Sequence, residues 1–263
     1  MIDTGPLGVK TPYIQTYTPE LLFPVSRQQA RGPLGIECPF KGCDIWTGYE
    51  LSWLNAKGKP EITIAQFIFP CANPFLIESK SFKLYLNSFN QSKFDSHEEV
   101  RLILERDLSR AAGGDVRIVF LKTLIPSEIE GICLDDLDVE TDVYEMRPEF
   151  LRVGECTVEE TVVSHLLKSN CLATGQPDWG TVVIDYQGKQ IDHEGLLKYI
   201  ISYRNHSGFA EHCAEQMFMD LMKICQPEKL SLQILYTRRG GLDINPFRST
   251  WQLTPETRRL CRQ

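Results

Sequence analysis

Two stretches of sequence that begin 115 residues apart decide the fold: KLYLNSFNQSKFDSH (83–97) and KYIISYRNHSGFAEH (198–212). Aligned without gaps, they share identical residues in the pairs Lys83/Lys198, Asn90/Asn205, Ser92/Ser207, Phe94/Phe209 and His97/His212. A few identities of this kind can arise by chance. The order of the elements around each stretch therefore has to decide whether the chain contains a repeat.

The elements around the first stretch follow the order strand, helix, helix, strand. EITIAQFIFP (61–70) is typical of a strand, and helical spacing follows over 76–91. A capping box that begins at Ser96 predicts a second helix over 96–112, which a Gly-Gly pair ends. The apolar run DVRIVFLKTL (115–124) predicts the closing strand.

A similar order recurs around the second stretch. The sequence predicts strands over 157–167 and 180–187, helices over 194–206 and 209–225, and a strand over 230–236. The recurrence favours two copies of one α+β module, each with a sheet that its helix pair covers on one face. Unpaired sheet edges favour association, so we expect a homodimer.

Two segments outside the repeat have a different composition. Residues 1–40 are rich in Pro and Gly, which predicts an extended arm rather than a core element. Residues 126–150 combine acidic residues with turn formers, which predicts an exposed connection. We therefore expect two domains: 1–135, with the arm and the first module, and 136–263, with the second module.

The charge balance and the hydropathy argue against several classes of protein. A net charge of -7 over 263 residues speaks against a general nucleic-acid surface, which needs excess Lys and Arg. No window approaches the roughly 20 apolar residues that span a bilayer. The N-terminal MIDTGPLGVKTPYIQ lacks the apolar core of a secretory signal. We expect a cytoplasmic protein whose nine cysteines are reduced thiols.

Sequence motifs for metals and nucleotides are weak or absent. The nearest metal pattern is Cys38-x4-Cys43, which has no matching second pair, so we expect no metal site. The sequence has no G-x-G-x-x-G after a strand, no Walker loop and no H-E-x-x-H helix. A nucleotide cofactor would need a site of another type.

The cysteine in the most reactive setting is Cys171, in SNCLATGQPDWG (169–180). It lies between two predicted strands, in a loop where exposure would permit the nucleophilic thiolate. Asp178 lies across the same turn and can donate a proton if a pocket raises its pKa. The alternative interpretation is an incidental loop thiol beside a solvated aspartate.

Three short runs have the composition of a ligand site. ESKS (78–81) places two hydroxyls and an ammonium at the head of a helix, where phosphate binds. RRGG (238–241), with Arg248 beyond it, combines bidentate donors with close backbone approach. In FAEH (209–212), Glu211 can accept hydrogen bonds from a purine-like ring. Each run also has a plainer interpretation: ESKS as the start of a capped surface helix, RRGG as a charged turn, and FAEH as a helix cap.

These motifs together resemble the NADPH-dependent 7-cyano-7-deazaguanine reductase family (QueF), in its long two-module form. The resemblance extends from about Pro19 to Ser249. It is carried by LIESKSFKLYLNSFNQ (76–91), SNC…TGQPDWG (169–180), IDHEGLLKYIISYRNH (191–206) and TRRGGLDINPFRS (237–249). Its most specific parts are the ESKS run and the spacing from the cysteine to the aspartate.

The resemblance implies a fold and a reaction. The fold would be the tunnelling fold (T-fold), present twice per chain. Cys171 would add to the nitrile carbon and form a covalent thioimide, Asp178 would protonate the nitrogen, and two NADPH would complete the reduction to an amine used for queuosine in tRNA. The implied substrate contacts are Glu78, Glu211, Ile77 and Ser79. The implied NADPH contacts are Ser79, Lys80, Ser81, Arg238, Arg239 and Gly240.

One position departs from the family pattern. The family usually has His-Glu where this chain has Ala210-Glu211, and that imidazole covers the substrate and assists proton transfer. His212 lies two residues further on, about 200° around a helix, so it is not a clean replacement. Leu172 stands where proline is common, which is a milder change.

Two other functions stay open at this point. Pterin-ring hydrolysis, another T-fold activity, would need metal-binding Cys and His sets that the sequence spacing does not offer. A non-catalytic or weakened purine-binding protein is the second, and Ala210 is its main support. All three functions involve a small-molecule partner, and none of them calls for a nucleic acid or a membrane.

Overall fold

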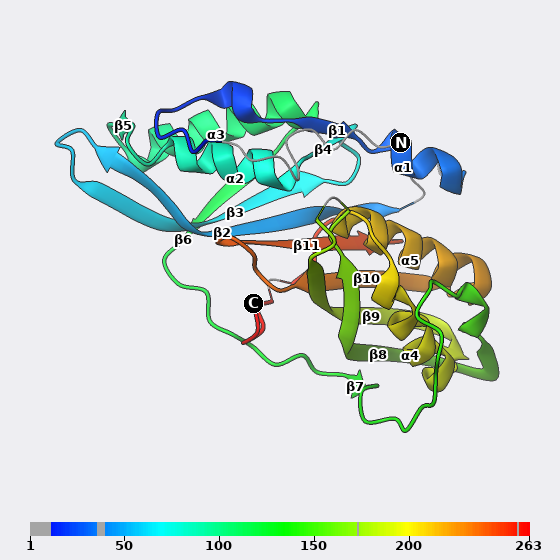
Figure 1. Ribbon diagram of the computed structural model, residues 1–263. Helices are drawn as coiled ribbons and strands as arrows, with labels where there is room; N and C mark the ends of the chain where they lie inside the picture. Colours follow the sequence, from blue (N-terminus) through cyan, green and yellow to red (C-terminus); the bar gives the residue numbers. More distant parts are fainter. Residues whose placement is uncertain (1–11, 36–39, 173, 257) are drawn as a thin grey trace. The chain divides into compact units, whose positions relative to one another are not determined.

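The computed structural model describes residues 12–35, 40–172, 174–256 and 258–263, and these form two compact units (Figure 1). Unit 1 contains the described residues of 1–38, 44–125 and 238–243. Unit 2 contains those of 39–43, 126–237 and 244–263. The chain leaves unit 1 after Ile125, at the start of the acidic connection in which the sequence places the change of module.

Unit 1 is built on the strand order β6–β3–β2, with helices α2 and α3 along one face (Figure 1). β3 pairs antiparallel with β6, β5 pairs in parallel with the end of β2, and β1 and β4 form a separate two-stranded sheet. Its elements are η1 (Pro19–Leu21), β1 (Pro24–Ser26), α1 (Gln28–Arg31), η2 (Gly32–Leu34), β2 (Lys41–Asn55), β3 (Pro60–Pro70), β4 (Phe75–Ile77), α2 (Ser79–Ser88), β5 (Lys93–Phe94), α3 (His97–Ala112) and β6 (Arg117–Leu121).

The two helices of unit 1 bury apolar stripes against its sheet. Val100, Leu104 and Leu108 recur every four residues along α3, and all three are fully buried. On α2, Phe82 packs edge-on against Phe67 of β3, with ring centroids 4.9 Å apart. Each such side chain contributes about 1.5–3 kcal/mol on burial, so the helical spacing determines which face covers the sheet.

Both ends of α3 agree with the sequence prediction. The Ser96 hydroxyl accepts a hydrogen bond from the Glu99 amide (3.1 Å), and the Glu99 carboxylate accepts one from the Asp95 amide (2.7 Å). At the other end Gly113 is left-handed, with φ 72°, and its amide donates to the Ser109 carbonyl. Local side chains therefore start and stop this helix, which is why its bounds could be predicted.

We expect Ser96→Ala to lower the free energy of unfolding by about 1 kcal/mol, because the Glu99 amide loses its acceptor. Urea unfolding followed by circular dichroism measures the change. Ser96→Asp keeps an acceptor at the same place and is the matched control. An equal loss in both variants would show that the cap is not responsible.

The N-terminal arm and the start of α2 differ from the sequence prediction. β1 pairs with β4, so the described part of the arm contains a strand, and its Val25 is only 2% exposed. The same pairing holds Phe75–Ile77 extended, so α2 begins at Ser79 and not at residue 76. Residues about 50 positions apart form this pair, and a local pattern does not reveal it.

Unit 2 has the strand order β11–β10–β9–β8–β7, and all of its neighbours are antiparallel except β7 and β8. Its helices are α4 and α5. Its elements are β7 (Ile132–Cys133), η3 (Pro148–Phe150), β8 (Val153–Asn170), β9 (Pro177–Ile191), α4 (His193–Ser202), η4 (Tyr203–Asn205), α5 (Ala210–Ile224), β10 (Lys229–Tyr236) and β11 (Leu242–Ser249).

The order of elements and one matching contact are consistent with an internal repeat, but the contact pairs Tyr85 with Tyr199 and Asp107 with Asp220, which the gap-free alignment of the sequence does not align. If the shorter strands are left aside, β2, β3, α2, α3 and β6 of unit 1 follow the same order as β8, β9, α4, α5 and β10 of unit 2. In unit 1 the Tyr85 hydroxyl of α2 donates to the Asp107 carboxylate of α3 (2.9 Å). In unit 2 the Tyr199 hydroxyl of α4 donates to the Asp220 carboxylate of α5 (2.7 Å). The same buried hydrogen bond therefore joins the helix pair in both units.

Several strands are absent from the sequence prediction or longer than predicted. β8 and β9 form a long hairpin, whereas the sequence predicts only 157–167 and 180–187. β2 is buried along most of its length, so it does not show the alternation of a half-exposed strand. β11 contains Pro246, which is unusual inside a sheet, and its pairing with β10 covers only 247–249.

The connection of 126–150 is irregular for most of its length, as predicted, and contains only β7 and η3. Among the described residues, none of the helices is long and apolar enough to cross a bilayer.

Candidate active site

Cys171 follows directly after β8, at the start of the loop that joins β8 to β9. Its amide donates to the Gln176 carbonyl (2.9 Å), and its carbonyl accepts from the Gly175 amide (3.0 Å). The residue is only 8% exposed, so the expectation of an exposed loop thiol is wrong. The reason is that the hairpin pairing continues through Cys171, and a bridge from Asn170 to Ser207 brings a second segment beside it.

Asp178 lies on β9, close to Cys171 in the register of the hairpin. In the ladder between β8 and β9, Ser169 lies opposite Asp178. The Cys171 amide donates to the Gln176 carbonyl, so the same register continues into the loop and Cys171 lies opposite Gln176. Cys171 and Asp178 are therefore diagonal neighbours on one face. Such neighbours lie about 7–8 Å apart, so a thiol and a carboxyl can both reach one small molecule on that face. Asp178 is half-buried.

A second segment fastens the Cys171 loop to the start of α5. The Asn170 amide donates to the His206 carbonyl (2.8 Å), and the Asn170 carbonyl accepts from the Gly208 amide (3.2 Å). Phe209 is the N-cap residue of α5, and a phenyl ring has no acceptor for the first amides of the helix. The positive end of the helix dipole favours an anion in this region.

Glu211 lies in the first turn of α5 and is 2% exposed. Two residues further on, burial raises the pKa of Cys213 to about 12, and the charges of Asp178 and Glu211 add to the increase. The same thiol faces the hydroxyl groups of Ser169 and Tyr236. Asp178 and Glu211, which the sequence predicts separately, therefore both lie near one buried thiol.

Cys213 and Tyr236 are neighbours of this site that the sequence prediction missed. Tyr236 pairs with Gly180 in the β10–β9 ladder, two residues after Asp178 on the same strand. The sequence did not predict the register between β9 and β10, and that register is what places Tyr236 beside the site. Cys213 carries no sequence signal of its own, because small apolar core positions of a helix are a common place for cysteine.

The structure shows the surroundings of position 210, where this chain has alanine in place of the expected histidine. Ala210 is the first residue of α5 and is half-buried. The His212 ring packs edge-on against Phe209, with centroids 5.3 Å apart. This contact supports the view that His212 does not replace an imidazole at position 210.

Glu78 is the N-cap residue of α2 in unit 1. Its carboxylate accepts hydrogen bonds from the amides of Lys80 (2.6 Å) and Ser81 (2.7 Å), and the residue is fully buried. Desolvation by burial raises the pKa of Glu78, although the two amide hydrogen bonds oppose the shift. Ile77, beside it, is 1% exposed. The substrate contacts predicted for Glu78 and Ile77 stay predictions.

The cofactor residues predicted from the sequence lie in unit 1. Ser79 and Lys80 are partly exposed in the first turn of α2. The Ser81 hydroxyl is engaged inside the unit, because it donates to the Glu78 carbonyl (2.7 Å) and accepts from the Phe23 amide (3.0 Å). Direct contact of Ser81 with a cofactor therefore has the least geometric support of the set.

The turn of 238–241 lies against α2. A Cβ atom on Gly240 would be 3.5 Å from Cδ of Lys83, and Gly240 has φ 62°, which suits glycine. Arg238 stacks on the Tyr49 ring (4.6 Å) and pairs with Glu50 at 3.5 Å, with its side chain 41% exposed. The structure thus brings the RRGG turn close to Lys83 of α2, as a common anion site requires.

Arg248 is not part of this cationic group. Its side chain is fully buried in unit 2, where its guanidinium donates twice to Glu215 (2.7 and 3.1 Å). The sequence pattern groups Arg248 with RRGG as a bidentate donor for a ligand, and this interpretation is wrong, because a fully buried ion pair has no surface left for a ligand. The Cys38-x4-Cys43 pattern cannot be judged as a pair, because Cys38 lies outside the described residues; Cys43 is 2% exposed.

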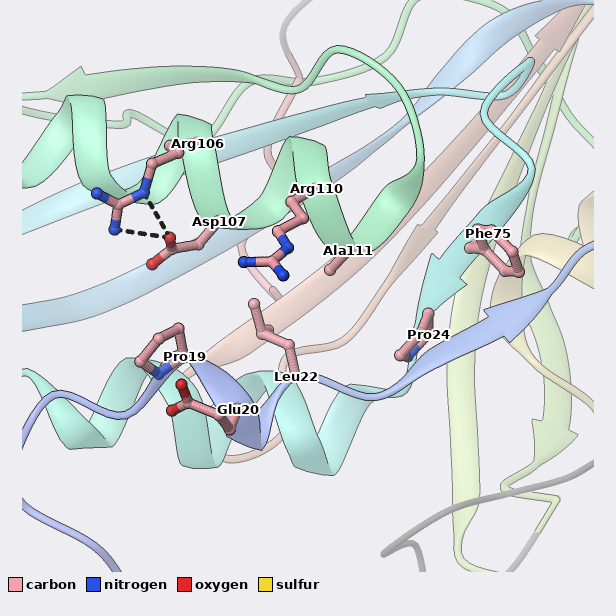
Figure 2. A pocket seen from close by; sticks show the side chains of 9 residues that line it. All are labelled: Pro19, Glu20, Leu22, Pro24, Phe75, Arg106, Asp107, Arg110 and Ala111. Carbon is pink, nitrogen blue, oxygen red and sulfur yellow. Dashed lines mark hydrogen bonds and ion pairs between the residues drawn. The ribbon is translucent and has the colours of Figure 1, made fainter.

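A cavity of ≈ 490 Å³ lies elsewhere in unit 1, between η1, β4 and α3 (Figure 2). Its charged residues are Glu20, Arg106, Asp107 and Arg110, and Arg106 pairs with Asp107 at 2.8 Å. None of the residues predicted for substrate or cofactor lines this cavity. It is therefore separate from both groups described above.

Comparison with known proteins gives two family matches. Residues 13–120 match the family described as nitrile reductase, 7-cyano-7-deazaguanine-reductase N-term, and residues 177–254 match the family described as QueF-like protein. Among solved structures, the archaeosine synthase QueF-Like in the apo form is similar at TM-score 0.32 and 16% identity. That match covers 36% of this chain and 94% of that one and is too weak to support an argument.

The curated relatives are far more similar. A protein of Hydrogenovibrio crunogenus is 50% identical over 99% of this chain and 97% of its own length. Proteins of Burkholderia vietnamiensis and Cupriavidus metallidurans are each 53% identical, over 99% of both chains. All three relatives are named NADPH-dependent 7-cyano-7-deazaguanine reductase.

Proposed function

The chain belongs to the NADPH-dependent 7-cyano-7-deazaguanine reductase family, and from this membership we propose that Cys171 and Asp178 carry out its chemistry. The protein reduces the nitrile group of 7-cyano-7-deazaguanine to the aminomethyl group of 7-aminomethyl-7-deazaguanine, in the biosynthesis of queuosine. NADPH supplies the hydrides. The observation that carries the residue assignment is the hairpin register, which sets Cys171 and Asp178 diagonally on one face.

A nitrile is a poor hydride acceptor, and covalent addition of a thiol changes that. The Cys171 sulfur bonds to the nitrile carbon, one C–N π bond breaks, and Asp178 delivers a proton to the nitrogen, which gives a thioimide. After a hydride reaches the carbon and a proton the nitrogen, the C–S bond breaks and releases a protonated imine, which gives up a proton to become the imine, and the Cys171 thiolate. A second hydride and proton convert the imine to the primary amine.

Glu211 is the residue of this site that suits recognition of the ring. The guanine-like edge presents a ring N–H and an amino group, and a carboxylate accepts from both. Its position in the first turn of α5 holds it close to the Cys171 loop, because Asn170 bonds to the segment that leads into α5. The start of α5 therefore carries Glu211 and is also hydrogen-bonded, through the segment before it, to the loop of Cys171.

The charges of unit 1 support a cofactor site for NADPH. Lys80, Lys83 and the RRGG turn present positive groups, and Gly240 allows a close approach of the backbone. These residues would hold the phosphates of the cofactor through bidentate and point-charge contacts. When bound, the cofactor supplies the two hydrides. Ser79 would contribute a hydroxyl at the helix start.

We also propose that both units are T-fold modules and that the protein is a cytoplasmic homodimer. The strand–strand–helix–helix–strand order of each unit supports the first point. β6 is the last strand of its sheet order, so it offers one edge for pairing with another chain. The described cysteines are free thiols, which suits a reducing compartment. Light scattering coupled to size exclusion tests the dimer, and a monomer at working concentration would refute it.

The function is tested by mixing the protein with 7-cyano-7-deazaguanine and NADPH. Absorbance at the nicotinamide band should fall by two NADPH per nitrile, because a nitrile needs two hydrides to become an amine. Without NADPH, intact mass spectrometry should show the protein plus one nitrile. Binding without NADPH consumption and without an adduct would favour the alternative, a purine-binding protein that has lost its chemistry.

We expect Glu211→Gln to weaken binding of the nitrile about 10- to 100-fold, because an amide replaces a charged acceptor. The effect should appear in KM and in the dissociation constant more than in kcat. Glu228→Gln, at an exposed position of the same unit, is the matched control. A change confined to kcat would mean that Glu211 acts in the chemical step and not in recognition.

Ala210→His should raise turnover, because it restores the imidazole that the family usually has at this position. The measurement is kcat/KM for the nitrile over a range of pH, with Ala210→Gln as a control of similar size that cannot titrate. An unchanged kcat/KM in Ala210→His would show that other residues already fill the role.

A further inference from the structure

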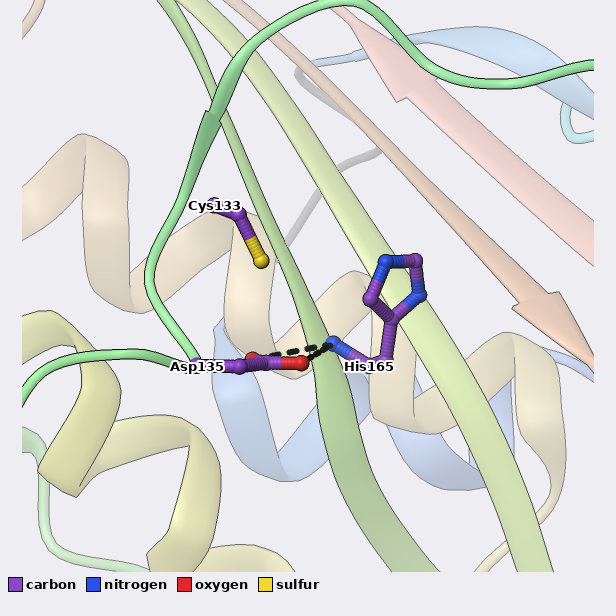
Figure 3. A group of neighbouring side chains, drawn as sticks. All are labelled: Cys133, Asp135 and His165. Atoms are coloured by element: carbon purple, nitrogen blue, oxygen red, sulfur yellow. Dashed lines mark hydrogen bonds between the residues drawn. The ribbon is translucent and has the colours of Figure 1, made fainter.

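Three side chains with the chemistry of metal ligands meet in unit 2: Cys133, Asp135 and His165 (Figure 3). Cys133 ends β7, Asp135 lies two residues beyond it, and His165 lies on β8. One ligand atom from each residue lies within 4.8 Å of the other two. Neither Cys133 nor His165 appears in any of the residue roles described above.

The backbone holds the three residues in this arrangement. β7 pairs in parallel with β8, with Cys133 opposite Val163, and the Leu134 amide donates to the Val163 carbonyl (2.8 Å). A Cβ atom on Gly131 would lie 2.9 Å from the Thr161 carbonyl oxygen, so this close approach to β8 needs glycine. The connection is therefore fixed against the strand that carries His165.

Asp135 is oriented by hydrogen bonds and still has a free acceptor position. Its Oδ1 accepts from the Ser164 hydroxyl (2.8 Å), and both of its oxygens accept from the His165 amide (3.2 and 3.0 Å). A carboxylate has about four lone-pair sites, so Oδ2 keeps one for a further ligand.

The other two ligand groups are available in the described part of the chain. Within it, neither the Cys133 thiol nor Nε2 of His165 has a hydrogen-bond partner. Nδ1 of His165 lies 2.9 Å from the Thr181 hydroxyl. That hydroxyl also accepts from Arg262 at 3.5 Å, and Arg262 donates to the His165 carbonyl at 3.0 Å. If Nδ1 donates to Thr181, Nε2 presents its lone pair, the usual arrangement for a metal-bound histidine.

We propose that Cys133, Asp135 and His165 bind a divalent zinc ion, with a fourth position open to water. Thiolate, imidazole and carboxylate are a ligand set that zinc accepts, whereas magnesium and calcium prefer oxygen alone. The thiolate and the carboxylate together neutralise the charge of the ion, while Arg262, which donates to the His165 carbonyl, is a cation that opposes it. Zinc bonds of about 2.0–2.3 Å need the ligand atoms somewhat closer together, which a rotation of the exposed Cys133 side chain provides.

The sequence gives no sign of this site. Cys133-x-Asp135 is too short a motif to indicate a metal, and His165 is supplied by a different strand. The inference is independent of the nitrile reduction, because it involves none of the residues assigned to that reaction.

The test is a zinc titration of the full chain after treatment with a chelator and a reductant, in competition with a chromophoric chelator. Cys133→Ser and His165→Gln should each bind one equivalent fewer than the unaltered protein. Thr181→Val, which removes the partner of Nδ1 and a long contact of Arg262 while keeping all three ligands, should weaken that equivalent about 10- to 100-fold. Cys156→Ser removes another exposed thiol of unit 2 and should change nothing.

Cobalt(II) gives a second readout, because a bound thiolate produces a charge-transfer band in the near ultraviolet. The band should be present in the unaltered protein and in Cys156→Ser and should be lost in Cys133→Ser. Far-ultraviolet circular dichroism establishes that each variant is folded. Equal zinc stoichiometry in the unaltered protein and Cys133→Ser, or a cobalt band that survives in Cys133→Ser, would overturn the proposal.

Discussion

Cys171→Ala should lower NADPH consumption with 7-cyano-7-deazaguanine by more than about 10³-fold, because the variant has no atom to form the covalent bond. Intact mass after incubation with the nitrile should show no adduct. Binding of the nitrile should survive, because the recognising carboxylate of Glu211 is unchanged. Stopped turnover together with retained binding would separate a missing nucleophile from a collapsed pocket.

The matched control is Cys156→Ala. Cys156 is a free, exposed cysteine of β8, the strand that leads to Cys171. Its loss should leave both turnover and the mass adduct unchanged. If Cys171→Ala still formed an adduct of the same mass, another thiol would be the nucleophile, and the buried Cys213 would be the next residue to replace.

Asp178→Asn should slow formation of the adduct by about 10²–10⁴-fold, because the nitrogen of the nitrile loses its proton donor. An amide keeps the size and hydrogen-bonding shape of the side chain, so the dissociation constant of the nitrile should change little. The rate of mass increase measures the first effect, and calorimetry in the absence of NADPH measures the second.

Asp138→Asn is the control for Asp178→Asn, because Asp138 is an exposed aspartate of the connection in the same unit. It should have no effect on either measurement. A large loss of binding in Asp178→Asn with an unchanged rate for the bound fraction would assign Asp178 to recognition. The proton would then have to come from another group.

The two units differ in how far their predicted residues agree with a binding role. In unit 2, Asp178 and Glu211 lie near the same buried thiol, and both are tied to the Cys171 loop through the hairpin and α5. In unit 1, Glu78 and Ser81 form hydrogen bonds that begin α2. A cap and a ligand contact are compatible where a further lone pair is accessible, so a ligand at Glu78 would have to use a lone pair that the two amides leave open.

The predictions that succeeded rest on interactions between residues close in sequence. The capping box at Ser96 and the left-handed Gly113 determined the bounds of α3, and helical spacing determined which face it buries. The α+β class was likewise visible, because a sheet has to be covered by helices on one face. The two strands around Cys171 were also predicted, because their patterns are local, and the structure pairs them in one hairpin.

The predictions that failed concern pairs of segments that are distant in sequence. The strand β1, the late start of α2 and the burial of Arg248 all depend on partners that a local pattern does not identify. The exposure of Cys171 was also misjudged, because the segment of residues 206–208 packs beside its loop.

The amino-acid sequence by itself determined the α+β class, the pair of strands around the candidate nucleophile, and a resemblance that proved to be family membership. Only the tertiary structure decided that Cys171 is sheltered, that the RRGG turn lies against α2, and that Cys133, Asp135 and His165 meet. The physical reason is that capping hydrogen bonds and periodic burial involve residues close in sequence, so a local pattern reveals them. Strand pairing brings together residues whose separation along the chain has no fixed period.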